Sequence, residues 1–408
     1  MEVLHRRCAG LDVHQQTVVA CARLVERSKV RQEVATFETT VKGLSALREW
    51  LQGHRCTHAA MESTGVYWKP VWLALDGALD LVLAHAQEVR NLPGRKSDVN
   101  DSMWLADLMA HGLIRASFVP SAEIQALREL SRTRTQLSRE KAHHTQRIQK
   151  TLEIAGVKLA GVISDVLGVT GRAMIEAMIA GESDPQTLVQ LKRRGIRATK
   201  EQLLDALQGR LREHHRMLLQ IHLNQIDAID QAMRALEARM GDLLEPFRDP
   251  IDLLKTLPGI QETTARIVLS EIGFDLARFP TAGHLIAWAG LCPGSDESAG
   301  KRRSTRLRKG NIWLRTALVQ AAWSAVRTKN TYLRGFYLRL RARQGSKKAI
   351  VAVAASMLTS IYYVLQRHEP YADLSPNHFE SRHRDRVARR LIQRLHDLGL
   401  QVEVKVAA

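Results

Sequence analysis

The sequence predicts a mixed α/β domain at the N-terminus, followed by a helical arm and a mainly helical C-terminal domain. Three observations support this. Strand-like and helix-like segments alternate in the first 115 residues, a long helical periodicity fills residues 121–245, and short helices separated by Gly/Pro turns follow Pro250. With 408 residues, the chain is long enough for several cores. We therefore expect domains at 1–115, 116–248 and 249–370, and a basic tail at 371–408.

The first domain begins with strands. Residues 6–24 have the pattern of a strand, a short turn at 14–16 and a second strand, and residues 30–39 form a third. Two short apolar strands follow at 57–61 and 79–85. The second of them is continuously apolar, which is typical of a sheet that is covered on both faces.

Helical segments separate these later strands. Residues 41–54 predict an amphipathic helix, residues 65–76 a helix interrupted near Pro70, and residues 97–111 a last helix. The resulting order is βββ-α-β-α-β-α. Three antiparallel strands followed by alternating helices and strands suit a ribonuclease-H-like mixed sheet.

Four carboxylates lie at ordered places in this domain. Asp12 falls within the first strand, Glu62 at the C-terminal end of the fourth, and Asp98 with Asp101 at the start of the last helix. Taken singly, Asp98 could cap its helix, Asp101 could favour the helix dipole and Glu62 could be a loop acid. An aspartate inside an apolar strand is harder to dismiss, because an unpaired buried charge is costly. Together the four predict a site for Mg²⁺, with two metal ions possible, of the type that cuts phosphodiesters.

The middle of the chain has a different pattern. Residues 121–154 predict a long polar helix, and residues 155–197 predict short helical pieces between glycines. From His215 onward a 4-3-4-3 spacing predicts a coiled-coil seam and a helical hairpin arm that dimerises. The histidines on this seam, His215 and His222, could form a metal or pH site, but polar positions that set the register are the favoured interpretation. The seam residues are His215, Leu219, His222, Ile226, Ile229, Met233, Leu236 and Met240.

After Pro250 the pattern changes again. Residues 253–273 predict a helix-hairpin-helix, whose turn at Gly259 can offer backbone N–H groups to a nucleic-acid phosphate. A plain helical connector is the alternative. Residues 293–310 predict a Gly/Ser/Lys/Arg loop between two helices, and residues 349–365 predict a buried helix.

The charge of the chain is strongly asymmetric. The formal net charge is +18 and the pI is about 10.1. Residues 299–368 contain sixteen Lys and Arg residues and no Asp or Glu, whereas a merely soluble surface would mix both signs. This segment therefore predicts phosphate binding. The residues assigned to nucleic acid, besides Gly259, are Lys301, Arg302, Arg303, Arg306, Arg308, Lys309 and Arg315.

Other classes are disfavoured. No stretch approaches the roughly 18–20 uninterrupted apolar residues of a transmembrane helix, and no signal peptide is recognised. The four cysteines show no CxxC pairing, so neither zinc nor a disulfide framework is indicated. No P-loop motif is present. A cytoplasmic protein without a membrane partner is expected.

The ordered motifs resemble those of a known family. GLDVH, MESTG and RKSDVND occur near the N-terminus, and LPGI…EIG, AWAGLCPG, ESAGKRR and KGN occur after residue 250. Together they resemble the DEDD transposases of the insertion-sequence one-ten family. The resemblance covers the first quarter of the chain and roughly residues 250–370. Residues 155–210 look longer than a minimal connector, and the Arg/His-rich tail from Tyr371 extends past these motifs.

The resemblance implies a RuvC-like domain whose catalytic quartet is Asp12, Glu62, Asp98 and Asp101. It implies a nucleophilic serine at Ser298, within Glu297-Ser298-Ala299-Gly300, where many relatives have glycine in place of Ala299; Ser295 and Ser304 are nearby alternatives. It also implies recombination of donor and target double-stranded DNA through a phosphoserine intermediate, guided by a non-coding bridge RNA. A homo-oligomer, a dimer or a tetramer on DNA, is expected, and two protomers could compose one site.

Two other functions fit the residues. The first is a Holliday-junction endonuclease of RuvC type, in which the quartet uses water as the nucleophile and Ser298 is structural. The second is a basic architectural protein with a degenerate quartet. Low aromatic content, at 5%, favours contacts to nucleic-acid backbones over base stacking, but this does not separate an RNA-guided protein from a nonspecific DNA binder.

Overall fold

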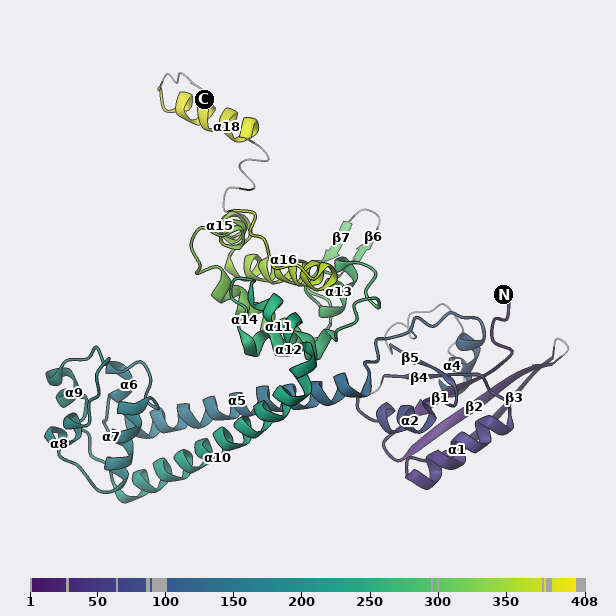
Figure 1. The fold of residues 1–408 in the computed structure, drawn as a ribbon, viewed down its shortest axis with the longest axis horizontal. Coiled ribbons are helices and arrows are strands. Elements are labelled where there is room, and N and C mark those ends of the chain that lie inside the picture. The colour runs from purple at the N-terminus through teal and green to yellow at the C-terminus, as the bar shows by residue number, and fades with distance from the viewer. Residues whose placement is uncertain are drawn as a thin grey trace. The chain divides into compact units, whose positions relative to one another are not determined.

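The computed structural model describes the chain except residues 1, 27–28, 64, 86–88, 90–100, 295, 299–300, 376–377, 379–383 and 401–408. The side chains of residues 296–298, 301–303, 384–387 and 390 also lie outside the description. The chain divides into two compact units, Met1–Val119 and Pro120–Ala408 (Figure 1). The finer division of the second unit stays a prediction.

The first unit is built on a five-stranded mixed sheet. Its strands are β1 (Arg7–Val13), β2 (Thr17–Glu26), β3 (Lys29–Glu38), β4 (His58–Glu62) and β5 (Asp80–Ala84), in the spatial order β3-β2-β1-β4-β5. The first three strands pair antiparallel, whereas β4 is parallel to both β1 and β5. This topology fits the ribonuclease-H-like, RuvC-like fold that the sequence predicts.

Helices cover both faces of this sheet. Helices α1 (Val41–Gly53) and α2 (Trp68–Leu75) bury apolar side chains such as Leu47 and Leu75 against Leu11 and other residues on one face. Helix α4 (Asp101–Ala110) packs on the other face, where Met109 and Ala110 contact Cys8 and Ala60. The expected interruption at Pro70 is wrong: Pro70 lies in the first turn of α2, where its missing N–H has no helical partner to lose.

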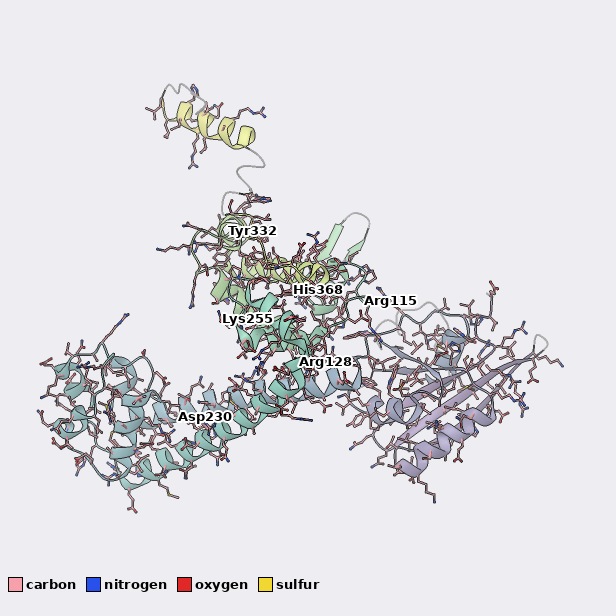
Figure 2. All side chains as sticks on the ribbon, viewed as in Figure 1. Arg115, Arg128, Asp230, Lys255, Tyr332 and His368 are labelled. Atoms are coloured by element: carbon pink, nitrogen blue, oxygen red, sulfur yellow. The ribbon has the colours of Figure 1, made fainter. Side chains whose placement is uncertain are left out.

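The second unit begins with a helical arm. The long helices α5 (Ala122–Ile154) and α10 (Glu213–Leu244) pack against each other along their lengths. Ion pairs join them, with Lys141 Nζ 2.6 Å from Asp230 Oδ1 and Arg134 NH2 2.6 Å from Glu237 Oε1 (Figure 2 marks Asp230). Buried Leu219, Leu223 and Ile226 of α10 share a core with Ile148 and Leu152 of α5. The apolar stripe therefore packs within the chain, and dimerisation of the arm stays a prediction.

Four short helices connect α5 to α10: α6 (Leu159–Val162), α7 (Val169–Ile179), α8 (Pro185–Gln190) and α9 (Lys200–Ala206). They are not a loose linker, because Met174, Ile175, Leu188 and Leu203 are buried in the core shared with the ends of α5 and α10. Residues 155–210 thus form a folded helical cap on the arm.

The rest of the second unit is mainly helical. The 3₁₀ turn η1 (Glu245–Phe247) leads into α11 (Arg248–Lys255), α12 (Glu262–Ile272) and α13 (Ala282–Ala289), then a β-hairpin of β6 (Asp296–Ser298) and β7 (Lys301–Ser304). Helices α14 (Ile312–Ala325), α15 (Tyr332–Gln344), α16 (Ser346–Arg367) and α18 (Arg384–Asp397) follow. The prediction of a loop over 293–310 is therefore wrong in part, since this segment contains the hairpin.

Helix α16 is the one helix among the described residues that is long and apolar enough to cross a membrane. Ten of its residues, including Val353, Met357 and Ile361, are buried in the protein. The helix packs against α14, α15, α13 and α11. The sequence-based expectation of a buried core helix at 349–365 is thus confirmed.

Candidate functional site

Two of the predicted carboxylates lie side by side on the sheet. Strands β1 and β4 pair in parallel with Gly10 opposite Ala60 and Leu11 opposite Met61, so the same register carries Asp12 to Glu62 at the strand ends. Neighbouring strands are about 4.8 Å apart. Asp12 lies two residues after Gly10, and Glu62 two residues after Ala60, so both point to the face that α4 covers.

Gly10 sets the distance between α4 and the strand that carries Asp12. A Cβ atom at Gly10 would lie 2.1 Å from Ser102 O and 2.4 Å from Ala106 N, so only glycine permits this approach. Two residues earlier in β1, Cys8 Sγ donates to Ala106 O at 3.4 Å. The helix therefore runs opposite to β1, and its first residue, Asp101, comes at the Gly10–Asp12 end of the strand.

Asp12 has a histidine neighbour at the same end of β1. His14 Nε2 lies 3.2 Å from Asp12 Oδ2, and the Asp12 side chain is 25% exposed. This partial exposure leaves the carboxylate accessible from solvent, unlike a buried structural aspartate. Glu62 also interacts with neighbouring groups. The fourth predicted carboxylate, Asp98, lies outside the described residues.

The donor set suits a hard divalent cation. Asp12, Glu62 and Asp101 all offer carboxylate oxygens, the ligands that Mg²⁺ prefers, and the strand register and Gly10 bring their backbones to one end of the sheet. Within the described part of the chain, no three His, Cys, Asp or Glu side chains are already grouped as metal ligands. The assignment of the quartet stays a prediction that this geometry supports.

Ser298 lies on a β-hairpin of the second unit. It is the last residue of β6 and pairs with Lys301, the first residue of β7. The alternative Ser304 lies at the other end of β7 and is the Cα partner of Asp296, while Ser295 lies outside the described residues. The hairpin therefore carries Ser298 next to the turn and Ser304 toward its base. The side chain of Ser298 lies outside the description.

The base of this hairpin is closed by backbone contacts. Gly294 N donates to Arg306 O and Arg308 N donates to Cys292 O, both at 3.1 Å. Gly290, in the left-handed region at φ +70°, ends α13 so close to the returning chain that a Cβ would lie 2.9 Å from Arg308 O. The two arms of the serine hairpin are thus held together where they leave the helices.

A buried carboxylate, which the sequence patterns did not reveal as functional, fixes this base to the arm. Glu271 on α12 is fully buried. Arg132 of α5 donates from Nε and NH2 to its two oxygens, each at 2.8 Å, and Asn311 Nδ2 donates to Glu271 Oε2 at 2.6 Å. Asn311 also caps α14, the helix that follows the hairpin in the chain. The signal was present, because Glu271 belongs to the EIG motif and Asn311 to the KGN motif.

Arg128 completes this junction (Figure 2). Its Nε donates to Ser270 O at 3.1 Å, its NH2 group donates to Glu271 O, and its guanidinium lies 5.9 Å from the centre of the Trp288 ring. Burial lowers the pKa of Arg128 to about 10, and the Glu271 carboxylate opposes part of that shift. Helices α5, α12, α13 and α14 therefore meet around one buried charge network.

The predicted phosphate-binding residues fall into two groups. Arg306, Arg308 and Lys309 are exposed on the segment that follows β7, and Arg315 NH1 donates to Arg308 O at 3.5 Å. The side chains of Lys301, Arg302 and Arg303 lie outside the described residues. The described cations therefore lie exposed next to the hairpin, and their binding to phosphate stays a prediction.

Gly259 has a packing role that the sequence did not reveal. It has φ +82°, and a Cβ there would lie 2.3 Å from Ala321 O and 2.7 Å from Ala325 N of α14. The turn between α11 and α12 thus needs glycine to approach α14. Packing alone therefore explains why residue 259 is glycine, and no bound ligand is needed for that explanation. Binding of a phosphate at Gly259, as in a helix-hairpin-helix, stays a prediction.

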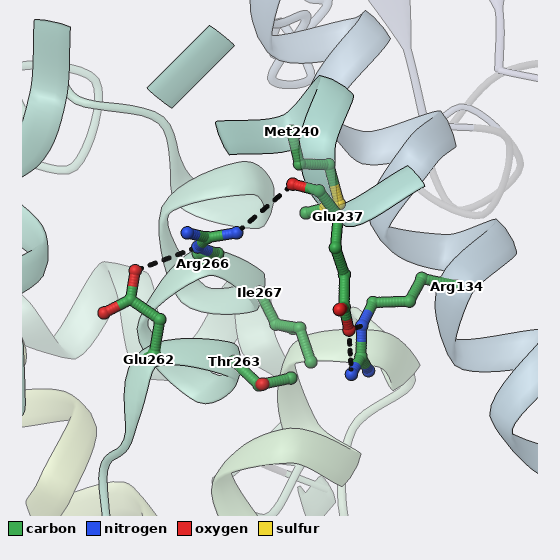
Figure 3. Close-up of a pocket in the computed structure, with 7 residues that line it drawn as sticks. All are labelled: Arg134, Glu237, Met240, Glu262, Thr263, Arg266 and Ile267. Carbon is green, nitrogen blue, oxygen red and sulfur yellow. Dashed lines mark hydrogen bonds and ion pairs between the residues drawn. The ribbon is translucent and has the colours of Figure 1, made fainter. Parts of the chain in front are cut away.

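A pocket of about 250 Å³ lies where α12 meets α5 and α10 (Figure 3). Its charged lining is internally paired: Arg134 with Glu237, and Arg266 Nε with Glu262 Oε1 at 3.0 Å. Arg266 NH1 also lies 3.5 Å from Glu237 O. The pocket is a polar junction between helices, and it contains none of the predicted catalytic residues.

Comparisons with known proteins match both the segment that carries the carboxylates and the segment that carries the serine hairpin. A family model for DEDD transposases of IS110 type, described as "Transposase", matches residues 9–156, which include Asp12, Glu62, Asp98 and Asp101. A second, described as "Transposase IS116/IS110/IS902 family", matches residues 251–338, which include the serine hairpin. The chain belongs to the IS110 family of DEDD transposases. Transposases are enzymes that cleave and transfer DNA.

Individual relatives support the assignment to the IS110 family. The chain is 24% identical over 374 residues to the "Probable family 20 transposase" of Pseudomonas aeruginosa, covering 89% of this chain and 94% of that protein. It is 30% identical over 154 residues to an uncharacterized 43.6 kDa protein of insertion element IS110 from Streptomyces coelicolor, which is 37% of each chain. Both family models leave residues 157–250, with the helical cap, unmatched.

Proposed function

We propose that this IS110-family transposase recombines DNA through a covalent bond to Ser298. The Ser298 oxygen attacks a DNA phosphate and forms a serine–phosphorus bond. The phosphorus–oxygen bond to the departing DNA strand breaks, and the departing oxygen becomes a hydroxyl as the proton lost by Ser298 is balanced by one gained there. A hydroxyl of the other DNA strand then attacks the phosphoserine and releases Ser298. The phosphodiester energy is kept in the covalent bond, so no nucleotide is consumed.

The observation that carries this proposal is the placement of Ser298. It lies beside the turn of a hairpin whose base is fixed through Asn311 and Glu271, and the segment that follows this hairpin exposes Arg306, Arg308 and Lys309. Positive charges held near a scissile phosphate stabilise the charge that develops in the transition state. A serine on a mobile surface loop would have neither the fixed position nor the cations.

Asp12, Glu62, Asp98 and Asp101 would hold Mg²⁺ in the same reaction. A bound Mg²⁺ neutralises phosphate oxygens and stabilises the attacking and departing oxygens. The role of this chain's carboxylates is to position the metal at the end of the sheet, where the register of β1 and β4 places Asp12 and Glu62 together. We further propose that the complete site combines carboxylates and serine from different protomers of a dimer or tetramer.

The proposed partners are donor and target double-stranded DNA and a non-coding bridge RNA that selects them. The basic segment 299–368 supports binding to phosphate backbones, and its lack of acidic residues disfavours a purely structural face. Sequence choice by RNA pairing is consistent with a protein that contacts backbones rather than bases. The proposed location is the cytoplasm, at the nucleoid.

The decisive experiment is to trap the adduct. The full chain is incubated with the DNA that flanks its gene, RNA transcribed from those flanks and MgCl₂, and the covalently bound residue is mapped by mass spectrometry. Ser298→Ala is expected to abolish both the adduct and strand exchange. Ser304→Ala is the matched control on the same hairpin and is expected to retain them. An adduct that still forms in Ser298→Ala would refute the assignment.

A metal nuclease that uses water is the second candidate, and the adjacent positions of Asp12 and Glu62 favour it. Under this alternative, Ser298→Ala cuts DNA at the normal rate and no adduct forms. Asp12→Asn combined with Glu62→Gln abolishes cleavage under both mechanisms. If this double variant cleaves normally, the carboxylates have no catalytic role and the chain acts as an architectural DNA binder.

A further inference from the structure

The loop between α8 and α9 concentrates positive charge in the helical cap. Residues 185–200 contain five Lys and Arg residues and no Asp or Glu. The guanidinium-bearing residues Arg193, Arg194 and Arg197 are all exposed. Among the described residues, none of these three side chains forms an ion pair. This loop lies outside both family-model matches and far along the sequence from Ser298.

The backbone of this loop is held in place. Lys192 Nζ donates to Ala198 O at 2.6 Å and closes the loop on itself. Arg193 N donates at 3.0 Å to the hydroxyl of Thr170, a buried residue of α7. Thr199 begins α9 with a reciprocal capping box to Gln202. The arginines therefore project from a fixed frame, and less conformational entropy is lost when they bind a ligand.

Several basic side chains elsewhere in the arm and cap are paired with acids. Arg172 of α7 pairs with Asp227 and Glu176 at 2.7 Å, and Lys158 pairs with Glu153. Lys141 and Arg134 are paired across α5 and α10. The three arginines of the loop differ from these paired cations, because they lie within residues 193–197 and form no ion pair in the described part of the chain. The acid nearest in sequence, Glu201, follows Lys200 and has its pKa lowered chiefly by local hydrogen bonding, with a smaller contribution from Lys200 and Lys192.

The chemistry of the loop selects the kind of ligand. Arginine guanidinium groups bind phosphate oxygens in paired hydrogen bonds. Residues 155–210 contain no Phe, Trp or Tyr, so the cap has no aromatic side chain on which a base could stack. Contact with the phosphodiester backbone, independent of base sequence, is the interaction that these residues can make.

We infer that the loop of residues 192–200 is a second nucleic-acid binding site, which grips the phosphate backbone through Arg193, Arg194 and Arg197. It goes beyond the proposed recombination chemistry, because it requires neither Ser298 nor the carboxylates. Its effect is to anchor nucleic acid at the end of the arm while the reaction takes place elsewhere. The backbone could belong to duplex DNA or to the guide RNA, and the experiment separates the two.

The test measures binding of the full chain without Mg²⁺, so that no cleavage contributes. Fluorescence anisotropy follows binding to a labelled random-sequence DNA duplex and, separately, to a labelled RNA hairpin, from about 50 mM to about 200 mM salt. The variant carries Arg193→Gln, Arg194→Gln and Arg197→Gln. The matched control removes three exposed cations from α5 and α10 with Lys150→Gln, Arg234→Gln and Arg239→Gln.

The loop variant is expected to bind at least one of the two nucleic acids about ten-fold more weakly at the upper salt concentration, with a salt slope lower by about two to three. The control is expected to change affinity by less than about three-fold. Loss on only the duplex or only the hairpin identifies the ligand. Equal losses in both variants, or no loss in the loop variant, would overturn the inference. Circular dichroism of each variant checks that the cap remains folded.

This outcome is separable from that of the proposed function. A Ser298→Ala protein that fails to form an adduct should still bind through the loop with unchanged affinity. Conversely, if Ser298 is not the nucleophile, the effect of the loop variant on binding is unaltered. Each proposal thus has a readout that the other does not change.

Discussion

Asn311 Nδ2 donates a hydrogen bond to Glu271 Oε2 at 2.6 Å, joining the end of the serine hairpin to the core of the second unit. The same carboxylate receives Arg132 of α5 through two hydrogen bonds. Because Asn311 ends the segment that leads from β7 into α14, the position of the hairpin depends on a charge network that reaches the arm. The motifs EIG and KGN are therefore two sides of one contact.

Glu271→Gln should destabilise the second unit by about 3 kcal/mol, because it leaves the largely buried guanidinium of Arg128, and the partly exposed one of Arg132, without a balancing charge. Denaturant unfolding followed by circular dichroism measures the change. The matched control is Glu262→Gln on the same helix, whose carboxylate is 45% exposed and pairs with Arg266. It should cost less than about 1 kcal/mol. Equal costs in the two variants would show that the Glu271 network is not a stabilising hub.

Gly10→Ala should displace α4 from the sheet, because the added Cβ would meet backbone atoms of Ser102 and Ala106. A cost of about 1–3 kcal/mol is expected, together with loss of DNA cleavage as Asp101 moves away from Asp12. The control Gly53→Ala lies at the end of α1, where no atom comes within 4 Å of the added Cβ. The control should cleave normally. A stable, active Gly10→Ala protein would contradict the close approach of α4.

Gly259→Ala separates a packing role from a phosphate-binding role. The added methyl would clash with α14, so the unfolding midpoint should fall clearly below that of wild type. Gly345→Ala provides the comparison, since Gly345 also has a positive φ, +79°, but open space at the Cβ position. A larger loss at position 259 isolates the clash. If Gly259→Ala instead keeps full stability and weakens DNA binding, the phosphate-binding interpretation of this turn is correct.

The arm should lose stability in mild acid through His222. Its Nδ1 lies 3.2 Å from Nδ1 of His144, and burial first, then the charges of His144 and Arg147, lower its pKa below the usual value of about 6.5. The folded arm therefore binds the His222 proton less readily than the unfolded chain. The stability contributed by this contact is complete above about pH 6.5, falls as the pH drops from there toward the lowered pKa, and levels off below it.

Unfolding midpoints measured between about pH 7.5 and about pH 5 test this expectation. His222→Gln should flatten the acid limb of the profile, whereas His143→Gln, at an exposed position of α5, should leave it unchanged. An identical acid limb in wild type and His222→Gln would assign the sensitivity to other groups. We therefore expect His144 and His222 to form a pH-sensitive polar contact within the arm, at a position where a coiled-coil seam would usually have an apolar residue.

Much of the first unit followed from sequence patterns. Alternation in β1 to β3, the apolar runs of β4 and β5 and the amphipathic α1 predicted the succession of strands and helices along the chain, because a sheet with a covered face restricts which residues can point inward. The long α5 and the stripe on α10 predicted the arm. The hairpin at β6 and β7 was missed, since its short strands are polar and charged, and such strands have no hydrophobic period to detect.

The sequence by itself determined the kinds of chemistry: four carboxylates in order, a serine in a basic segment without acids, and glycines at fixed places in the motifs. Only the tertiary structure decided what those glycines and polar residues do. Gly10 and Gly259 are needed because helices α4 and α14 approach their backbones, and Glu271 stabilises the hairpin base because Arg132 and Asn311 reach it from distant segments. Contacts between segments this far apart arise from three-dimensional packing, which no local pattern along the chain encodes.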